Sequence, residues 1–290
     1  FKDITIASGI EFTHYNGAAG NKYMPETMGS GCAFIDYDND GKIDILLVNG
    51  MDFSANSKSS SHTLRLYRNI GGGKFEDVTT EAGLGVAMYG MGVAVGDFDN
   101  DGWLDVVVAN GHVLDNCHEG NQALEYEQKM QIYHNTSGTK FDEVGENCGS
   151  SFQSKYVGRG LAVGDFNNDG KLDILVSNNK GPLRLLENKT SNKNNWISLS
   201  LVGTKCNKSA IGSRVTIKTS SKSLTREVGS GSYLSQSDLR LHFGLGTDDK
   251  VESLTVRWAG SNGKPGEVET FSGLAVNKFH SITQGKSLRS

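Results

Sequence analysis

Three segments of the chain repeat one pattern, in which a loop rich in Asp and Gly joins two short apolar runs. They are Gly31–Asn49, Gly92–Asn110 and Gly160–Asn178. Their leading acidic residues follow one another at intervals of roughly 60 to 70 residues, a period that suits a repeated supersecondary unit. Each copy is typical of a strand, a tight loop and a second strand. The chain is therefore expected to contain equivalent β units.

A second repeated feature follows the first two copies. Leu66–Asn69 leads through a Gly-rich turn to Phe75–Thr79, and Ile132–Asn135 leads in the same way to Phe141–Val144. Two short runs joined by Gly predict a β-hairpin. Each unit is then expected to hold about four antiparallel strands, as a propeller blade does.

The third unit has Leu183–Asn188 but no second run after it. A matching run stands at the other end of the chain, because Phe1–Ile10 is similar to Phe75–Leu84. We therefore expect the N-terminal strand to complete the last blade and so protect its edge. Three blades are fewer than the usual 4–8. A ring of low order, an open arc, self-association that completes a ring and absent internal blades all remain open.

The pattern changes after Asn195. Trp196–Leu201, Val215–Ile217, Leu239–Phe243 and Leu254–Trp258 alternate apolar and polar residues, with Ser, Gly and Asn between them. This predicts an antiparallel β-sandwich. The expected fold class is all-β, with a propeller-like domain at residues 1–190, a linker at 191–195 and a sandwich domain at residues 195–285. The best candidate for a short helix is Gln122–Gln131.

The repeated loops carry oxygen ligands at alternate positions, an arrangement suited to a hard cation such as Ca²⁺. A Gly after the third ligand permits the sharp turn that lets the next residue offer its backbone carbonyl. Lys42, Trp103 and Lys171 would act through that carbonyl. The predicted ligands of three Ca²⁺ sites are Asp36, Asp38, Asp40, Lys42 and Asp44; Asp97, Asp99, Asp101, Trp103 and Asp105; and Asp165, Asn167, Asp169, Lys171 and Asp173.

These loops differ from an EF-hand, which ends in a bidentate Glu at position 12 and leads into a helix. The corresponding residues here are Leu47, Val108 and Val176, each within an apolar run. One such loop could be a solvated turn. Three in the same register favour a cation that stabilises each hairpin. Because Asn167 replaces a carboxylate, we predict that the third site is the weakest.

Composition excludes some classes of protein. The chain has 33 acidic and 29 basic residues, with a net charge of −4, and its Lys and Arg form no dense stripe, which argues against a nucleic-acid binder. No apolar run approaches ~20 residues, so no membrane span is expected. The chain begins at Phe1 without a leader pattern, which is consistent with a removed signal peptide.

The cysteines and glycosylation triplets give weaker signals. Cys32 opens an apolar strand and is expected to be a buried thiol, whereas Cys117 and Cys148 could either pair or remain free; Cys206 completes the set. Three N-x-S/T triplets, at Asn135, Asn188 and Asn207, matter only in a secreted, glycosylated chain.

Other candidate sites compete with structural interpretations. One is a ligand groove in the Gly/Ser-rich stretch, formed by Arg226, Glu227, Tyr233, Gln236 and Asp238; a strand-to-loop bend is favoured there. Another is a transition-metal cluster, formed by His112, Cys117, His118 and Glu119; an exposed loop is favoured there. Trp103 could stack on a sugar, whereas Trp258 is expected in the core.

No catalytic signature is present: the sequence has neither a G-x-S-x-G elbow nor H-E-x-x-H. We therefore expect a protein that is not an enzyme. A glycosidase pair of carboxylates leaves no local signature, so a carbohydrate-active protein that uses the propeller face stays an alternative.

The loops and their flanks, such as Ala94–Asn110, resemble FG-GAP/VCBS repeats. Segments within Val202–Trp258, including Arg226–Asp238 and Leu241–Gly246, resemble the ASPIC/UnbV domain of cartilage-acidic-protein-like proteins. The resemblance implies a secreted, extracellular or periplasmic, calcium-binding and non-catalytic scaffold. It would interact with an extracellular protein or glycan. An accessory role in bacterial natural-product assembly is a further alternative.

Overall fold

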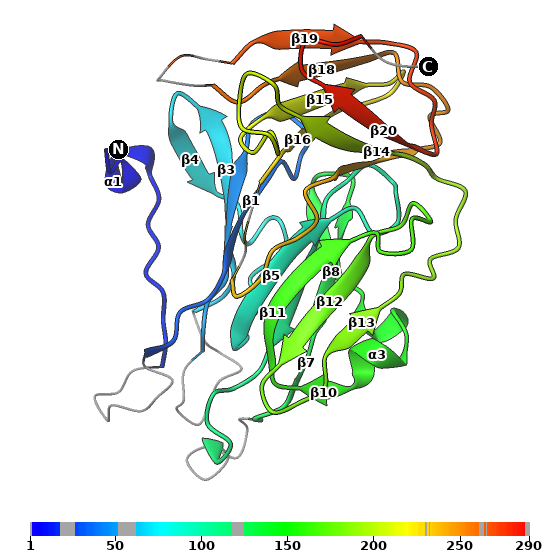
Figure 1. Cartoon of the computed structure of the whole chain (residues 1–290). Coiled ribbons are helices and arrows are strands. Elements are labelled where there is room, and N and C mark those ends of the chain that lie inside the picture. The colour runs from blue at the N-terminus through cyan, green and yellow to red at the C-terminus, as the bar shows by residue number, and fades with distance from the viewer. Residues whose placement is uncertain are drawn as a thin grey trace.

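The chain folds almost entirely into β-sheet, as the computed structural model shows (Figure 1). The structure describes residues 2–17, 27–51, 62–117, 125–229, 231, 233–260, 264 and 266–287. Within these ranges there are five sheets of three or four strands and a two-stranded ribbon. The all-β prediction is confirmed.

Three of the sheets are propeller-type blades, and each begins with one of the repeated motifs. The first two follow the chain order β1-β2-β3-β4 and β5-β6-β8-β9, and the third is β11-β12-β13. The strands are β1 (Cys32–Ile35), β2 (Asp44–Leu47), β3 (Arg65–Gly71), β4 (Lys74–Asp77), β5 (Gly90–Gly96), β6 (Asp105–Asn110), β8 (Gln131–Thr136), β9 (Lys140–Glu143), β11 (Gly158–Gly164), β12 (Asp173–Asn178) and β13 (Arg184–Leu186).

The pairing within the blades is antiparallel and follows the predicted hairpins. Ile35 pairs with Asp44, Gly96 with Asp105 and Gly164 with Asp173, so each Asp loop connects the first two strands of its blade. The β3–β4 and β8–β9 hairpins correspond to the second repeated feature. The expectation of four-stranded units thus holds for the first two blades.

The prediction that the N-terminal strand closes the third blade is wrong. Residues 2–17 contain no strand; they contain the short helix α1 (Thr5–Ser8), which contacts β4 of the first blade. Lys74 Nζ donates to the Ala7 carbonyl at 2.5 Å, and Tyr67 Oη donates to the Glu11 carbonyl at 2.7 Å. Figure 1 shows this segment beside β3 and β4. In the described part of the chain, β13 therefore pairs only with β12.

The last third of the chain forms a two-sheet sandwich. One sheet has the order β17-β14-β20 and the other β16-β15-β18-β19. The pairing is antiparallel except between β14 and β20, which run parallel, so the expectation of a wholly antiparallel sandwich needs this correction. The strands are β14 (Asn195–Val202), β15 (Arg214–Lys218), β16 (Ser223–Glu227), β17 (Leu241–Gly246), β18 (Ser253–Arg257), β19 (Val268–Phe271) and β20 (Lys278–Thr283).

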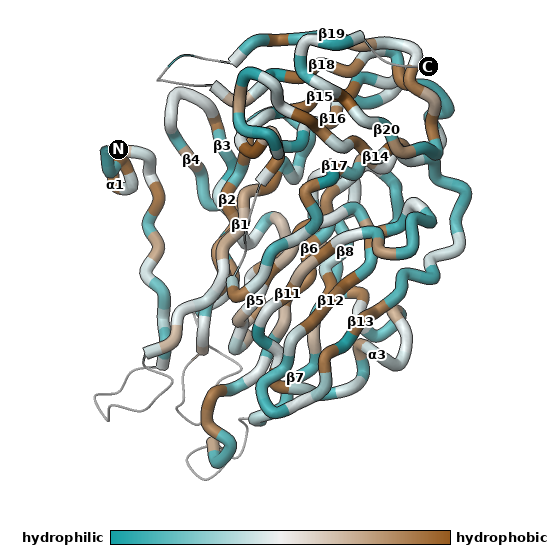
Figure 2. The backbone as a smooth tube through the Cα atoms, viewed as in Figure 1, coloured by the Kyte–Doolittle hydropathy of each residue, from teal (hydrophilic) through white to brown (hydrophobic). Residues whose placement is uncertain are grey.

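Apolar side chains form three cores, which follow this division. One fills the sandwich around Phe243 and Trp258, as expected for Trp258. A second lies where the first two blades meet, around Leu46 and Val106, and a third lies where the second and third blades meet, around Val107 and Leu161. β6 contributes alternate side chains to both blade cores, which is why all six of its residues are buried. Figure 2 shows this apolar interior along β5, β6, β11 and β12.

Several local predictions fail in the described residues. The candidate helix at Gln122–Gln131 is not helical from residue 125 onward; it contains β7 (Gln128–Lys129), which pairs with β10 (Lys155–Tyr156). Cys32 is exposed rather than buried, and none of the four cysteines forms a disulfide, so Cys117 and Cys148 do not pair with each other. Near this ribbon lie the short helices η3 (Gly145–Asn147) and α3 (Ser150–Gln153). No helix in the described ranges is long and apolar enough to span a membrane.

Candidate metal centres

The three Asp loops have the same backbone conformation. Their fourth residue is an Asn in the left-handed region, with φ of 53° at Asn39, 61° at Asn100 and 58° at Asn168. The Gly two residues later also has a positive φ, of 80°, 95° and 82° in turn. Asn and Gly are the residues that adopt this region at low cost. The sequence thus forms one repeated tight turn that brings its acidic side chains together.

The first and last carboxylates of every loop are buried. Asp36, Asp97 and Asp165 are 1 to 4% exposed, and Asp44, Asp105 and Asp173 are 0 to 2% exposed. Burial disfavours the charged form of a carboxylate. It raises the pKa of Asp36 to about 6 and that of Asp44 to about 7, and it raises the pKa of Asp97 well above the ordinary value. A bound cation would reverse this penalty.

The last carboxylate of each loop joins the loop to the third strand of its blade. One oxygen of Asp105 accepts from the Phe98 backbone N–H at 3.0 Å, and the other accepts from the Asn135 N–H at 2.8 Å. Asp44 and Asp173 make the equivalent pairs. These carboxylates therefore fix the hairpin geometry and retain further lone pairs for a cation.

The middle carboxylates shape the turn. In the second loop, Asp99 Oδ1 accepts from the Asp101 N–H at 3.1 Å, and Asp101 Oδ1 accepts from the Trp103 N–H at 2.8 Å. The first and third loops repeat both bonds, with the Asn167 oxygen in the place of the Asp99 oxygen. Alternate side chains thus converge on the inside of the loop.

Asp36 departs from the pattern of its equivalents. Asp97 and Asp165 each accept two loop N–H groups, at 2.8 and 3.1 Å. Within the described residues neither buried oxygen of Asp36 accepts a hydrogen bond of normal geometry, although the Gly41 N–H lies near enough to lower its pKa. Buried polar groups are normally satisfied, so an orphaned carboxylate indicates an absent positive partner. The donor set therefore fits Ca²⁺, a cation that prefers carboxylate oxygens.

Among the described residues, the structure brings together the first three acidic side chains of the first and second loops, and no such acidic group is found in the third. Oxygens of Asp36, Asp38 and Asp40 lie within 4.8 Å of one another, as do those of Asp97, Asp99 and Asp101. The Lys42 ammonium pairs with Asp40 and would have to move before a cation could bind there. The backbone-carbonyl role of Lys42, Trp103 and Lys171 stays a prediction.

One position next to the loops was missed from the sequence. This position directly precedes the Asn that ends the third run of each repeat. It is occupied by Arg68, His134 and Glu187. His134 Nδ1 lies 3.2 Å from Asp105, which raises the pKa of the imidazole to about 9. Glu187 Oε1 accepts from Asn167 Nδ2 at 3.1 Å. The third loop thus has a neighbouring carboxylate where it lacks one of its own, a signal visible in the aligned repeats.

The loops are also linked to one another in order. Asn39 Nδ2 donates to the Gly102 carbonyl in the second loop at 3.0 Å, and Asn100 Nδ2 donates to the Gly170 carbonyl in the third loop at 3.0 Å. The third loop has no following blade in the described chain. Its Asn168 Oδ1 instead accepts from Arg240 Nη1 of the sandwich at 2.6 Å.

The sandwich covers the ends of the loops with further polar contacts. Lys222 Nζ donates to the Asp101 carbonyl, and His242 Nε2 lies 2.6 Å from Asn100 Oδ1. Gly244 lies so close that a Cβ there would be 2.1 Å from Asp97 Oδ2, so only Gly fits. Figure 1 shows the sandwich placed over this end of the blades. The sandwich therefore covers one side of the second loop, whereas Asp40, Asn167 and Asp169 of the other two loops are exposed.

Arg226 is the most deeply buried of these basic residues. It lies on β16, is 8% exposed, and its positive charge acts on both Asp36 and Asp97. Its Nε and Nη2 have no hydrogen-bond partner in the described residues. Arg226 thus supplies charge between the first two loops and does not line a ligand groove as one alternative proposed.

The rest of that proposed groove is a docking segment. Ser235 and Ser237 side chains accept from the backbone N–H groups of Leu161 and Val163 at 3.2 Å, and the Asp238 N–H donates to the Val163 carbonyl. Gln236 and Asp238 line a small surface hollow with Arg240, whereas Glu227 lies apart and pairs with Arg214. Tyr233 lies against Gly31. The stretch therefore attaches the sandwich to β11.

The remaining candidate residues from the sequence lie in several different parts of the structure. His112 and Cys117 are buried, whereas His118 and Glu119 lie outside the described residues. Trp103 is half-buried against Gly138. The side-chain amides of Asn135 and Asn188 donate to carbonyls of neighbouring strands and loops. Asn207 is exposed, and its amide likewise donates, to the Ile211 carbonyl at 2.8 Å.

The fold and the loops define a propeller-type FG-GAP repeat region followed by a second β domain, and sequence comparison agrees. The FG-GAP-like repeat family matches residues 36–108 and 123–176, and the ASPIC and UnbV family matches residues 203–289. The chain therefore combines FG-GAP-like repeats with an ASPIC/UnbV domain, which confirms the resemblance.

Cartilage acidic protein 1 from three vertebrates is similar in sequence to this chain. The chain is 27% identical to cartilage acidic protein 1 of Xenopus tropicalis over 67% of this chain and 37% of the relative. The identity is 27% for the mouse protein, over 89% of this chain and 36% of the relative, and 24% for the human protein, over 89% and 43%. The chain spans only about two fifths of the length of these relatives.

Proposed function

We propose that the protein is a secreted, non-catalytic β scaffold that binds calcium in its three Asp loops and presents its surface to an extracellular protein or glycan. The observation that carries the calcium part is Asp36, a carboxylate that is 1% exposed and whose oxygens accept no hydrogen bond of normal geometry from the described residues. The similarity to cartilage acidic protein 1, named for an extracellular tissue, supports the location.

The position of the loops favours a structural role for the cation. Catalytic metals keep a coordination position open to substrate, but here β17 and Gly244 lie directly on Asp97. The cation would stabilise the hairpins and the arrangement of the blades under the sandwich. A scaffold therefore agrees better with the structure than a carbohydrate-active enzyme that uses these carboxylates.

The expected stabilisation is sizeable. Extracellular calcium modules often bind with Kd of about 10⁻⁴–10⁻³ M. At ~1 mM Ca²⁺, a site with Kd of ~10⁻⁴ M stabilises the fold by about 1.4 kcal/mol, and three sites by about 4 kcal/mol. This is a large fraction of the usual 5–15 kcal/mol of a domain.

Thermal unfolding tests the proposal. The melting temperature in 1 mM CaCl₂ should exceed that in EDTA by roughly 10 °C, given the usual entropy of unfolding. Asp36→Asn should reduce this difference, whereas Asp249→Asn, at an exposed position outside the loops, should leave it unchanged. Identical melting with and without EDTA would contradict the calcium proposal.

A further inference from the structure

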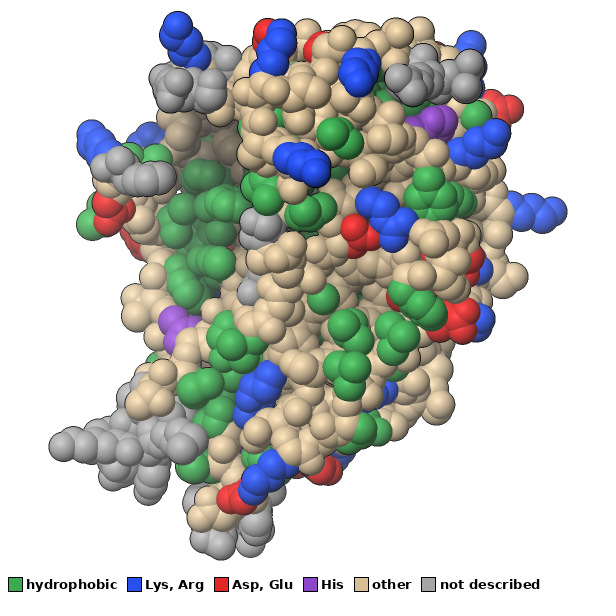
Figure 3. Space-filling view, in the orientation of Figure 1, with side chains coloured by type: hydrophobic (Ala, Val, Ile, Leu, Met, Phe, Trp, Pro, Cys, Tyr) green, Lys and Arg blue, Asp and Glu red, His purple; other side chains and the backbone are tan. Residues whose placement is uncertain are grey.

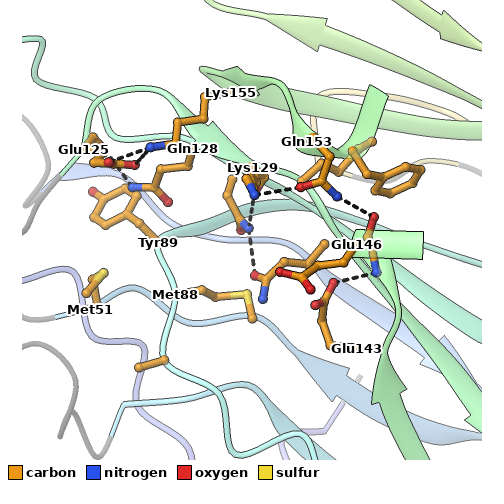
Figure 4. Close-up of a pocket in the computed structure, with 16 residues that line it drawn as sticks. Met51, Met88, Tyr89, Glu125, Gln128, Lys129, Glu143, Glu146, Gln153 and Lys155 are labelled. Carbon is orange, nitrogen blue, oxygen red and sulfur yellow. Dashed lines mark hydrogen bonds and ion pairs between the residues drawn. The ribbon is translucent and has the colours of Figure 1, made fainter. Parts of the chain in front are cut away.

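A pocket lies at the opposite end of the blades from the Asp loops. β6 begins at Asp105 in the second loop and ends at Asn110, about 17 Å away for a strand of this length. Asn110 lines the pocket together with residues of the β7–β10 ribbon, η3 and α3. The pocket has a volume of about 390 Å³. The sandwich lies at the other end of the blades (Figure 1), and Figure 4 shows the side chains that line the pocket.

The side-chain amides around the pocket use their donors within the wall. Asn110 Nδ2 donates to the Lys129 carbonyl at 3.0 Å and to Gln131 Oε1 at 2.9 Å. Gln131 Nε2 lies 2.9 Å from Tyr133 Oη, and Gln128 Nε2 donates to the Glu125 carbonyl at 2.9 Å. These bonds hold the wall together; Asn110 uses both of its amide N–H groups in them, whereas Gln128 and Gln131 each use one of two.

The two lysines of the pocket are likewise engaged. Lys129 Nζ donates to Gln153 Oε1 at 2.8 Å, and Gln153 Nε2 donates to the Gly145 carbonyl at 3.0 Å. Lys155 Nζ forms an ion pair with Glu125 at 2.5 Å. Figure 4 shows these bonds running along the rim. The lining holds three carboxylates (Glu125, Glu143 and Glu146) and two ammonium groups, a net charge of −1, and Lys129 keeps its charge because its partner is a neutral amide.

Acceptors, in contrast, remain available. Asn110 Oδ1 is buried without a hydrogen-bond partner in the described chain, and Asn110 is only 4% exposed. Glu143 accepts one backbone N–H, from Gly145 at 2.9 Å, which leaves its second oxygen. Glu146 forms no ion pair with the described residues. Figure 4 shows both carboxylates on the same side of the pocket.

Apolar side chains form the rest of the wall. Met88, Tyr89 and Phe152 line the pocket and are otherwise buried. Such a surface accepts an aliphatic stem or a flat group, and an aromatic face attracts a cation. The pocket therefore combines a partly apolar wall with acceptors and unneutralised carboxylates.

We propose that this pocket binds a basic side chain, guanidinium or ammonium, presented by a partner protein. Such a group has only donors, which match the acceptors left by Asn110, Glu143 and Glu146. A sugar hydroxyl can donate as well as accept, but it would leave the charges of Glu143 and Glu146 uncompensated. The inference goes beyond the proposed scaffold function and does not depend on the cation.

The experiment uses the full chain in 1 mM CaCl₂ and records methyl spectra of its methionines during titration with Nα-acetyl-arginine amide. The expected result is a saturable shift of the Met88 signal with a millimolar Kd, and a much weaker response to the neutral analogue Nα-acetyl-citrulline amide. Glu146→Gln should weaken binding about two- to fivefold, as expected for a partly exposed ion pair. Glu127→Gln is the control, because Glu127 is exposed and does not line the pocket.

Three results would overturn the proposal: equal binding of both probes, no effect of Glu146→Gln, or no shift at 20 mM arginine amide. A shift of Met88 with a maltooligosaccharide in place of the arginine probe would assign the pocket to a glycan instead. The melting experiment with EDTA is read separately, so the failure of one proposal leaves the other standing.

Discussion

Arg240 of the sandwich donates to Asn168 Oδ1 at 2.6 Å and to the Asp165 carbonyl at 2.6 Å. Asn168 has the same place in its loop as Asn39 and Asn100, whose amides reach the next blade. At the third loop the sandwich therefore takes the place that a following blade has at the first two. This contact makes the second domain part of the blade series.

Arg240→Gln should destabilise the protein, because it removes the charged donor from two acceptors. Hydrogen bonds from a charged group contribute about 1.5–3 kcal/mol each, so a loss of about 3 kcal/mol or more in the free energy of unfolding is expected for the two. Urea denaturation in calcium measures it. Arg257→Gln, at an exposed position on β18, should change stability by less than about 0.5 kcal/mol. Equal effects of the two variants would show that the contact has no energetic role.

Arg226→Met should affect the protein more strongly without calcium than with it. The positive charge of Arg226 acts to lower the pKa of both Asp36 and Asp97. Its removal leaves buried carboxylates without compensation, which costs about 3–5 kcal/mol. A bound cation would supply the missing charge and reduce that cost.

The measurement for Arg226→Met is the free energy of unfolding of wild type and variant in 1 mM CaCl₂ and in EDTA. Lys250→Met serves as the control, because Lys250 is exposed. A cost that is the same in both solutions would separate Arg226 from the metal centres.

Glu187→Gln should weaken calcium binding at the third loop. Within the described residues, the Asn167 amide donates to two carboxylates, those of Glu187 and Asp169. Loss of one partly exposed charge predicts a rise in Kd of about two- to fivefold. Asn167→Asp should tighten the same site. Calorimetric titration with Ca²⁺ distinguishes these outcomes from Glu81→Gln, an exposed control; no change in either variant would reject the assigned ligands.

His242 should make the fold sensitive to moderate acid. Burial, helped by the nearby Arg226 and Arg240, lowers the pKa of His242 to about 3. The unfolded chain binds a proton below about pH 6.5 while the folded chain does not, so stability falls as the pH drops below that value. Between pH 7 and pH 5 this group alone would remove about 2 kcal/mol.

His242→Gln should reduce that loss of stability between pH 7 and pH 5, since Gln has no proton to gain and can still bond to Asn100. Urea unfolding in calcium at both pH values gives the difference. His280→Gln is the matched control, because His280 lies outside the interface, on β20. If wild type and His242→Gln lost the same stability, His242 would not be the cause.

The metal loops could be predicted because their chemistry is local. The spacing of Asp97, Asp99 and Asp101 brings their oxygens together within one turn. The hairpins followed for the same reason. Arg240 and Asn168 meet only because a second domain docks on the blades, and no pattern near either residue indicates that contact. The pocket at Asn110 likewise depends on segments that are distant in sequence.

The N-terminal error has a related cause. Residues 1–10 do resemble residues 75–84, but similarity in sequence does not identify the partner of a segment. Side-chain and backbone contacts with Tyr67 and Lys74 hold it on the first blade. Ile4 and Ile6 remain exposed as a result, as do Leu183 and Leu185 beside the third blade. Figure 3 shows apolar side chains on the face of the molecule that is turned to the viewer in Figure 1.

The hydrogen bonds that Asn side chains make between successive loops connect each repeat to the next in the same way. In each of the first two loops, an Asn side-chain amide donates to a backbone carbonyl of the next loop. In the third loop, the Asn side-chain oxygen accepts from a guanidinium instead. We expect such a series to tolerate the insertion or deletion of a whole repeat, because the junction chemistry is the same at every internal step. Only the final junction would have to keep its arginine.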